Sequence, residues 1–243
     1  MQVLVFPDAH HLARAAARRI ATLIRSASAD TVSIAMAGGG TPKATYAELL
    51  RQDVPWQRVF AWVGDERFVP PDHPDNNSAM IGDVLAQTGA TYAPVPWRSE
   101  WSAADAATEY EGILEAHLND DGSGLRPDVM LLGMGDDGHT LSLFPGTDAL
   151  SVTDRWFVEN WVAAKDTWRL TTTFALAHRA RHILFLVSGA AKADALARVL
   201  EPPDDVTRLP AKHILNGQAD VTFFVDADAA GRLDSTLTVP ASP

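Results

Sequence analysis

A histidine that follows a glycine-rich turn is the clearest candidate for acid–base chemistry in this sequence. The apolar run 129–132 predicts a buried strand, and Gly133-Met-Gly-Asp-Asp-Gly-His139 follows it directly. A titratable side chain just beyond the carboxyl end of a strand lies where open α/β sheets bind ligands. Asp137 stands two residues before His139, and its carboxylate can orient the imidazole and favour its protonated form. A histidine that is only satisfied inside a turn explains these residues equally well, so other groups must support the catalytic interpretation.

A second glycine-rich turn, Gly38-Gly39-Gly40, predicts a contact with phosphate. The turn leads into a helix, with Thr41 expected as its N-cap and Pro42 as its first residue. Backbone N–H groups and the positive dipole end of a helix attract anions. A tight connection without a ligand is the plainer explanation, but three consecutive glycines cost more chain entropy than a bare turn requires. The turn is not a Walker loop, because Gly-Lys-[Ser/Thr] is missing.

Charged residues follow the next expected strand, 59–63, and form the segment Asp65-Glu66-Arg67. Paired acids beside a guanidinium could supply acid–base groups and a phosphate clamp. Arginine suits phosphate because its planar fork is always charged and binds two oxygens at once. A solvated loop with an ion pair is the alternative interpretation. We expect a loop at 64–70. Long loops at strand ends often carry function, which favours a functional part for this segment.

Two further cations are candidates for the same pocket. Arg169 precedes a run of threonines, and Lys192 stands three residues after Gly189 at the start of an expected helix. Each is a surface charge by default. If both lie at the ends of strands, they join Arg67 in a cationic pocket at the carboxyl edge of the sheet. Such a local cluster would let an acidic protein hold a phosphorylated acid or lactone.

Cofactor and metal chemistry find little support in the sequence. Residues 133–138 match G-x-G-x-x-G, and Glu159 follows about 20 residues later, as a dinucleotide fold requires. However, Pro145-Gly146 interrupts the chain too early for the crossover helix of that fold. His178 and His182 lack the carboxylate motif of a zinc site, and no G-x-S-x-G elbow of a serine hydrolase occurs. We therefore expect no cofactor and no metal.

The elements that must position these residues alternate between strand and helix. We expect strands at 3–6, 31–37, 59–63, 129–132, 183–187 and 221–225, with extended segments at 156–163 and 169–173. Helices are expected after Asp8, over 44–51, 78–87 and 102–118 with Ser102 as a cap, and over 190–200. This alternation predicts a doubly wound α/β fold, with a mostly parallel sheet and helices on both faces. We expect one domain, 1–243, with a loose tail over 228–243.

The composition limits the classes of partner. The chain has 243 residues, a formal net charge of −11 and no cysteine. The acidic balance argues against nucleic acid, and no apolar run approaches the roughly 18 residues of a membrane span. Cysteine-free composition excludes disulfides and suits a cytoplasmic location. The expected partner is a small phosphorylated molecule; the sequence does not distinguish a monomer from a homodimer.

Taken together, these segments resemble the 6-phosphogluconolactonase family, over about residues 3–225. The resemblance is carried, in order, by Ala37-Gly-Gly-Gly-Thr-Pro42, Gly64-Asp-Glu-Arg67, Gly133-Met-Gly-Asp-Asp-Gly-His139-Thr, Ser142-Leu-Phe-Pro-Gly146, Arg169 with Thr171 and Thr173, Gly189 with Lys192, and Pro210-Ala211 with Ile214. The family more often has serine in the middle of the first turn.

The resemblance implies hydrolysis of 6-phospho-D-glucono-1,5-lactone to 6-phosphogluconate in the pentose phosphate pathway. It implies His139 as general base, Asp137 and Asp65 beside it, and a phosphate held by Arg67, Arg169, Lys192 and the turn Gly38, Gly39, Gly40 and Thr41. The related glucosamine-6-phosphate deaminase/isomerase is the alternative. It carries a glutamate after its histidine, where this chain has Leu141-Ser-Leu-Phe-Pro145. A sugar-phosphate-binding protein without catalysis is a third interpretation.

Overall fold

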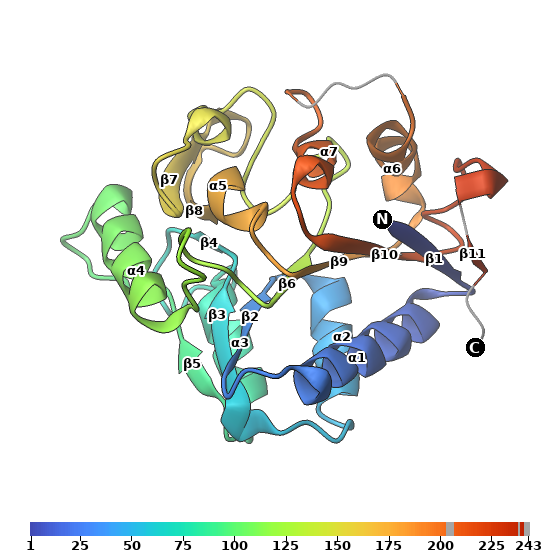
Figure 1. Cartoon of the computed structure of the whole chain (residues 1–243). Coiled ribbons are helices and arrows are strands. Elements are labelled where there is room, and N and C mark those ends of the chain that lie inside the picture. The colour runs from blue at the N-terminus through green and yellow to red at the C-terminus, as the bar shows by residue number, and fades with distance from the viewer. Residues whose placement is uncertain (203–206, 238, 241–243) are drawn as a thin grey trace.

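A parallel β-sheet of eight strands forms the centre of the computed structural model, which describes residues 1–202, 207–237 and 239–240 (Figure 1). Its strands are β1 (Gln2–Phe6), β2 (Val32–Met36), β3 (Val59–Val63), β5 (Thr91–Ala93), β6 (Val129–Leu132), β9 (His182–Val187), β10 (Asp220–Asp226) and β11 (Val239–Pro240). They lie in the order β11-β1-β10-β9-β6-β2-β3-β5, and every neighbouring pair is parallel.

Helices lie on both faces of this sheet. The helices are α1 (Ala9–Ser26), α2 (Gly40–Leu49), α3 (Asn77–Leu85), α4 (Ala103–His117), α5 (Phe174–Ala177), α6 (Ala193–Leu200) and α7 (Pro210–His213). Short 3-10 turns are η1 (Trp56–Arg58), η2 (Asp148–Ser151), η3 (Ala163–Lys165), η4 (Ala190–Lys192), η5 (Ile214–Asn216) and η6 (Ser235–Leu237). In Figure 1, α1 and α2 lie below the sheet and α6 and α7 above it. The predicted doubly wound α/β fold is confirmed.

Local sequence explains where two of the longer helices begin. The Asp8 side chain accepts a hydrogen bond from the His11 N–H and caps α1, as predicted. Ser102 and Asp105 form a reciprocal capping box at the start of α4, in which each side chain bonds the other residue's backbone N–H. Both helices then bury an apolar stripe, because their apolar residues recur every three to four positions.

The predicted N-cap of α2 is wrong. The helix begins at Gly40 and its N-cap is Gly39, so Thr41 lies inside the first turn. Gly39 adopts a φ of 109°, which a residue with a Cβ rarely takes. The glycine run therefore lets the chain turn sharply enough to start the helix two residues earlier than the Thr-Pro signal indicates.

A second, antiparallel sheet lies beside the first and was not predicted. It consists of β4 (Asp65–Arg67), β8 (Thr167–Thr172) and β7 (Phe157–Val162), in the order β4-β8-β7. The segment expected as a loop at 64–70 thus includes a strand. Arg169 lies within β8, opposite Arg67, and not at the carboxyl end of a strand of the main sheet. Three charged residues carry no strand signal, and β4 forms because β8 pairs with it from a distant part of the chain.

The main sheet reverses its strand order beside β2. The chain continues from β2 to β3 on one side, whereas β6 is added later on the other side of β2. Open α/β sheets bind ligands at the carboxyl ends of strands beside such a reversal. The two glycine-rich turns, at 38–40 and 133–138, follow β2 and β6 directly. The topology therefore brings both turns to one place.

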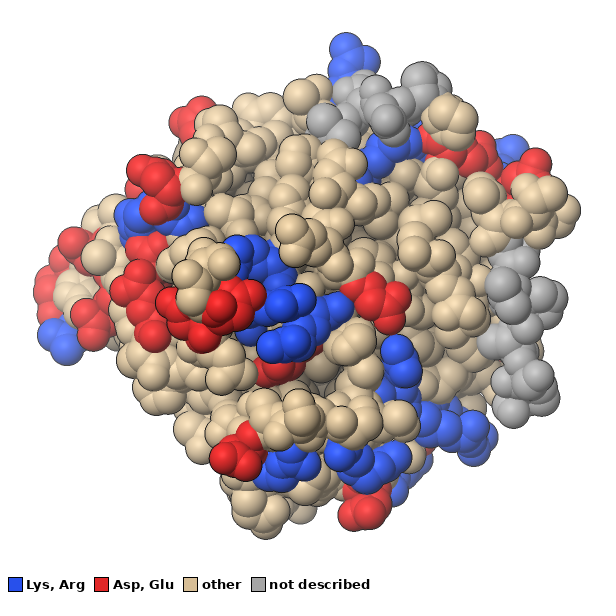
Figure 2. All heavy atoms as spheres, in the orientation of Figure 1, with Lys and Arg blue, Asp and Glu red and all other residues tan. Residues whose placement is uncertain are grey.

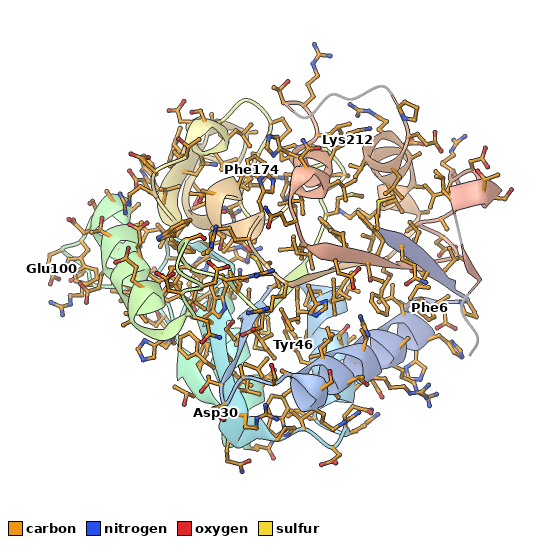
Figure 3. The ribbon with its side chains drawn as sticks, in the orientation of Figure 1. Phe6, Asp30, Tyr46, Glu100, Phe174 and Lys212 are labelled. Carbon is orange, nitrogen blue, oxygen red and sulfur yellow. The ribbon has the colours of Figure 1, made fainter. Side chains whose placement is uncertain are left out.

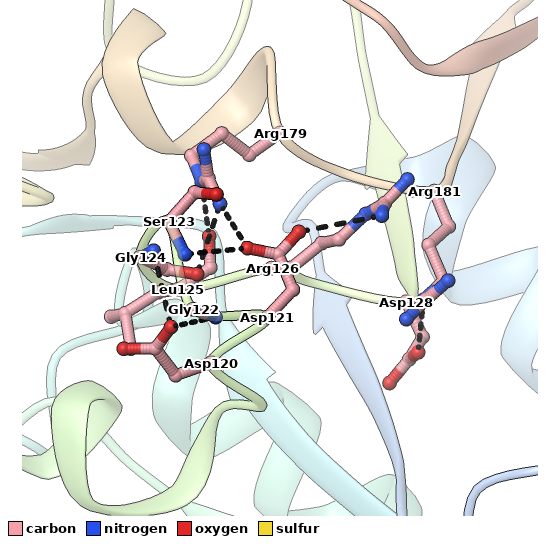
Figure 4. A network of polar contacts seen from close by, with 10 residues as sticks. All are labelled: Asp120, Asp121, Gly122, Ser123, Gly124, Leu125, Arg126, Asp128, Arg179 and Arg181. Carbon is pink, nitrogen blue, oxygen red and sulfur yellow. Dashed lines mark hydrogen bonds and ion pairs between the residues drawn. The ribbon is translucent and has the colours of Figure 1, made fainter.

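Ion pairs close the opposite, amino end of β6 and β9. Asp121 contacts Arg179 at 2.7 Å and Arg126 at 3.4 Å, and Arg181 contacts Asp128 at 3.1 Å (Figure 4). Figure 2 shows basic side chains gathered near the centre of one face, with acidic side chains to either side. The ion pairs of Asp121 and Asp128 join the loop before β6 to the residues before β9, away from the glycine turns.

The C-terminal segment leaves β10 through a turn in which Ala229 is buried, and β11 then pairs with β1. The expected looseness of 228–243 stays a prediction, and residues 238 and 241–243 of that tail lie outside the described residues. No helix within the described ranges is long and apolar enough to cross a membrane.

Candidate active site

A pocket of about 290 Å³ lies at the carboxyl ends of β2 and β6. Six of the predicted site residues line it: Gly38, Gly39, Asp65, Arg67, His139 and Lys192. These residues come from both sheets and from four separate parts of the chain. The predicted convergence of an imidazole, a carboxylate and cations therefore occurs in the structure.

Four predicted residues do not line this pocket. Gly40 and Thr41 lie in the first turn of α2, and Arg169 stands opposite Arg67 in the small sheet. Asp137 lies on the far side of His139 and lines a neighbouring open cleft of about 560 Å³. Of these four, Asp137 contacts His139 and Arg169 is paired with Arg67, and both of these partners line the pocket.

The His139 imidazole is held by Asp137. Its Nδ1 lies 2.5 Å from Asp137 Oδ1, and the same oxygen accepts a hydrogen bond from the His139 backbone N–H at 3.0 Å. Burial raises the pKa of Asp137, but the hydrogen bonds from the His139 side chain and backbone outweigh it and lower this pKa to about 2. The ionised Asp137 carboxylate accepts a hydrogen bond from Nδ1–H, so Nε2 is left to exchange protons with a ligand.

The ring of Phe144 packs against the other side of the histidine. The two ring centroids lie 3.9 Å apart and the planes are inclined by 23°. Phe144 is buried, so its ring forms a fixed surface behind the imidazole. The carboxylate and the phenyl ring together restrict rotation of the His139 side chain.

Gly135 has no side chain, and the Asp137–His139 pair occupies the space that a side chain would fill. A Cβ at position 135 would lie 2.1 Å from His139 Nδ1 and 2.4 Å from Asp137 Oδ1, closer than real atoms approach. The Gly135 N–H also donates to the His139 carbonyl at 2.8 Å and closes the turn. The second glycine of the turn is therefore required by the two side chains that follow it.

The same turn is supported from outside by the segment before α7. The Ala211 N–H donates to the Gly138 carbonyl at 2.9 Å, and the Leu209 side chain covers Gly138 so closely that a Cβ there would lie 2.5 Å from Leu209 Cδ2. The Pro210-Ala211 element of the sequence thus holds the histidine turn in place.

Asp65 is joined to the histidine turn by a hydrogen bond. The buried Ser142 hydroxyl donates to Asp65 Oδ2 at 2.7 Å. Leu141, which precedes it and lines the pocket, has a φ of 54°, a conformation that non-glycine residues adopt at a cost of about 1 kcal/mol or more. The surrounding contacts hold this strained residue, and it directs Ser142 toward Asp65.

Asn77 connects the first glycine turn to Asp65. Its Nδ2 donates to the Asp65 carbonyl at 2.8 Å, and its Oδ1 lies 1.8 Å from where a Cβ of Gly38 would be.

The Tyr46 hydroxyl, in the interior of the molecule (Figure 3), fixes the residue before the turn: it donates to the Ala37 carbonyl and accepts from the Ala37 N–H, each at 2.8 Å.

Glu66 has a structural role and does not line the pocket. Its buried carboxylate accepts hydrogen bonds from the backbone N–H groups of Arg67, Asn77 and Ser78 and from the Ser78 hydroxyl. Burial raises the pKa of Glu66, while these hydrogen bonds oppose the rise. Glu66 thereby ties β4 to the start of α3, and only the other acid of the pair, Asp65, faces the pocket.

Two arginines are paired on neighbouring strands of the small sheet. Arg67 and Arg169 are directly opposed in register, and the Nε of each is buried without a hydrogen-bond partner among the described residues. Burial and the neighbouring Arg67 charge lower the pKa of Arg169, against the pull of Asp65, Asp75 and Glu66. Like charges placed opposite each other are unfavourable, so an anion at this position would stabilise the pair.

Sequence reasoning missed Asn77, Ser142 and Phe144 as parts of the site. Ser142 and Phe144 stand within the block that follows His139, and their proximity in sequence was a usable signal. Asn77 had none, because its role depends on Gly38 and Asp65 coming together in space. No group of three or more His, Asp or Glu side chains that could hold a metal occurs within the described part of the chain.

Residues 7–223 match the profile of one protein family, described as glucosamine-6-phosphate isomerases/6-phosphogluconolactonase. A 6-phosphogluconolactonase from Synechocystis sp. is 40% identical over 208 residues, which cover 83% of this chain and 84% of that protein. A 6-phosphogluconolactonase from Mycobacterium tuberculosis is 32% identical over 243 residues, which cover 95% of this chain and 98% of that protein.

Solved structures are similar along nearly the whole chain. The structure of 6-phosphogluconolactonase from Trypanosoma brucei superposes with a TM-score of 0.85 at 28% identity, over 96% of this chain and 98% of that one.

Proposed function

Since the chain belongs to the family of glucosamine-6-phosphate isomerases and 6-phosphogluconolactonases, we propose that it hydrolyses 6-phospho-D-glucono-1,5-lactone to 6-phosphogluconate in the pentose phosphate pathway. The observation that carries this proposal is the Asp137–His139 pair, joined at 2.5 Å, at the wall of a pocket that also contains Arg67 and Lys192. A general base and a cationic cluster in one pocket are what hydrolysis of a phosphorylated ester requires.

The chemical step uses His139 as general base. With Nδ1 bonded to Asp137, Nε2 takes a proton from a water molecule as the water oxygen attacks the lactone carbonyl. The tetrahedral intermediate then collapses, the bond to the ring oxygen breaks, and the imidazolium returns the proton to that oxygen. Proton transfer of this kind contributes about 10²–10⁴-fold to a rate. A lactone is already an activated ester, so no covalent nucleophile is needed.

The negative charge of the intermediate falls on the former carbonyl oxygen. We assign its stabilisation to backbone N–H groups of the two glycine turns, at 38–40 and 133–138. The first N–H groups of α2 have no partner within the helix, and Gly39, its N-cap, lines the pocket. Donors that are already oriented stabilise developing charge without reorganisation. We assign to Asp65, which accepts a hydrogen bond from Ser142, either contact with hydroxyl groups of the sugar or the positioning of Arg67.

The phosphate is assigned to the cations of the pocket. Arg67 and Lys192 line it, and Arg169 lies opposite Arg67. A phosphate beside the two guanidinium groups would relieve their mutual repulsion. The proposed phosphate ligands Arg67 and Arg169 lie in the small sheet, whereas the proposed base, His139, follows a strand of the main sheet.

A sugar-phosphate deaminase or isomerase remains the alternative. Where that enzyme carries a glutamate after its histidine, this chain has leucine, serine, leucine and phenylalanine at 141–144. The ring of Phe144 lies against the imidazole, so the acidic neighbour of His139 is Asp137. This arrangement favours the lactonase. We further propose a cytoplasmic location, which the absence of cysteine supports; fractionation of expressing cells tests it.

The test is hydrolysis of freshly generated 6-phosphogluconolactone by the purified protein, followed as acid release with the spontaneous reaction subtracted. We expect rapid hydrolysis by the wild type and a fall of about 10²–10⁴-fold in kcat for His139→Asn. Equal activity in both proteins would keep the lactonase and remove His139 as the base. An inactive wild type would contradict the lactonase, and ammonia release from glucosamine 6-phosphate would then identify the alternative enzyme. Binding of 6-phosphogluconate without any turnover would indicate a sensor.

A further inference from the structure

A buried carboxylate outside the pocket organises the turn from which Lys192 arises. Asp226 is the last residue of β10 and is 4% exposed. Its Oδ2 accepts a hydrogen bond from the Ser188 hydroxyl at 2.5 Å, and its Oδ1 and Oδ2 lie 3.0 and 3.1 Å from the Gly189 backbone nitrogen. Asp226 thus holds two consecutive residues at the carboxyl end of the neighbouring strand, β9.

The turn that follows leads directly to the pocket. Gly189 is the N-cap of η4, and its carbonyl accepts a hydrogen bond from the Lys192 N–H at 3.0 Å. Lys192 ends this turn, precedes α6 and lines the pocket. The backbone position of the ammonium-bearing residue is therefore set by a short turn whose first residue is bonded to Asp226.

The same carboxylate also receives the chain that leaves β10. Asp226 Oδ1 accepts from the Ala229 N–H at 2.9 Å, which starts the turn after the strand. With both oxygens engaged by β9 and by this turn, the carboxylate has little freedom to move. Hydrogen bonds to a charged acceptor are about twice as strong as neutral ones, so this anchor is well suited to hold a loop at the edge of the sheet.

We propose that Asp226 is a positioning residue for substrate binding, which acts through Ser188 and Gly189 to hold Lys192 where it contacts the substrate phosphate. This inference rests on the proposed function for the identity of the ligand, but not for the effect of Asp226 on Lys192. It predicts that loss of the Asp226 carboxylate impairs affinity for the phosphorylated substrate while the His139 step proceeds.

The experiment is a double-mutant cycle with kcat and KM measured for 6-phosphogluconolactone. Lys192→Ala should raise KM by roughly tenfold or more, as expected for loss of one charged hydrogen bond. Asp226→Ala should raise KM several-fold and change kcat by less than about twofold. The double variant should have the KM of Lys192→Ala alone, because the anchor has no other route to the substrate.

Two conservative variants and one control separate positioning from general damage. Asp226→Asn keeps one acceptor oxygen and should restore most of the affinity, and Ser188→Ala should lie between the wild type and Asp226→Ala. Asp220→Ala, at the exposed amino end of the same strand, should leave KM unchanged. If Asp226→Ala does not fold, Ser188→Ala carries the same comparison with Lys192→Ala. Effects of Asp226 and Lys192 that multiply, or a fall in kcat without a change in KM, would overturn the proposal.

A measurement without substrate keeps this inference distinct from the proposed function. The chain has four lysines, Lys43, Lys165, Lys192 and Lys212, so ¹³C-dimethylated lysine resonances can be assigned by loss of one signal in Lys192→Ala. We expect the Lys192 resonance to shift in Asp226→Ala, and to stay close to its wild-type position in Asp226→Asn and in Asp220→Ala. An unchanged Lys192 resonance would refute the positioning role. An inactive wild type with a shifted resonance would contradict only the lactonase.

Discussion

Gly135 and His139 are in such close contact that a single methyl group on Gly135 would lie 2.1 Å from the imidazole Nδ1. The glycine-rich turn therefore does more than reverse the chain. It removes every atom that would stand between the backbone and the Asp137–His139 pair, and that pair can then pack against Phe144 on its other side.

Gly135→Ala should consequently lower kcat by roughly 10²-fold, the cost of misplacing a catalytic group by about 1 Å. The added methyl group must displace the imidazole or the Asp137 carboxylate. Steady-state hydrolysis of the lactone measures the effect, and circular dichroism verifies the fold. Gly112→Ala is the matched control, since a Cβ at Gly112 in α4 meets nothing within 4 Å. Full activity in Gly135→Ala would show that the site tolerates a displaced pair.

The Asp137 carboxylate should make stability depend on pH in a predictable direction. Its folded pKa, about 2, is lower than the ordinary value of 3.8. The stabilisation is therefore fully present above pH 4 and is lost as the pH falls toward 2. The difference in unfolding free energy between the wild type and Asp137→Asn should be largest near pH 6 and should shrink below pH 4. Urea unfolding at pH 6, 4 and 3 measures it. A difference for Asp137→Asn that stays constant over this pH range would contradict the assignment.

The opposed arginines should determine recognition of the phosphate. Arg67→Ala should weaken binding of the phosphorylated lactone by about 1.5–3 kcal/mol, which raises KM roughly 10–150-fold. Arg169→Ala should act in the same direction. Arg67→Lys should recover only part of the loss, because an ammonium cannot bind two oxygens as a fork. The comparison substrate is unphosphorylated gluconolactone, whose hydrolysis should be nearly unchanged in these variants. Arg51→Ala, exposed in the turn that follows α2, serves as the control variant. An equal loss with both substrates would assign the arginines to the fold instead.

Gly38 and Asn77 should behave as a coupled pair. Gly38→Ala places a Cβ 1.8 Å from Asn77 Oδ1 and should destabilise the protein by about 1–3 kcal/mol, as overpacking does. Asn77→Ala frees the space but loses the hydrogen bond to Asp65, at about 1 kcal/mol. The double variant should be more stable than the sum of the single effects predicts. Chemical unfolding of all four proteins measures the coupling, and strict additivity would show that the loop moves apart instead.

The sequence predicts those parts of the fold that depend on neighbouring residues. Asp8 and Ser102 were identified as helix caps because a cap bonds residues two or three positions later. The strand 129–132 has its predicted bounds, since a continuous apolar run leaves little choice. Thr41 shows the limit, because Gly39 offered a backbone conformation that displaced the usual Thr-Pro start.

Features that depend on distant residues could not be read in this way. The strand of Asp65, Glu66 and Arg67 exists only because β8 pairs with it, and this pairing also relocates Arg169. Glu66 and Asp65 look alike in sequence, yet one is buried at the start of α3 and the other faces the pocket. Asp226 carries no motif, and its importance arises from contact with Ser188 and Gly189 on another strand.

The division of the pocket between two sheets has a consequence for selectivity by length. His139 follows a strand of the parallel sheet, whereas Arg67 and Arg169 belong to the antiparallel one. A molecule that engages both must span the interval between them, and packing of the two sheets fixes that interval. The enzyme we propose would thus select substrates by the number of carbon atoms between the lactone carbonyl and the phosphate. A phosphorylated lactone one carbon shorter would reach the base or the arginines, but not both.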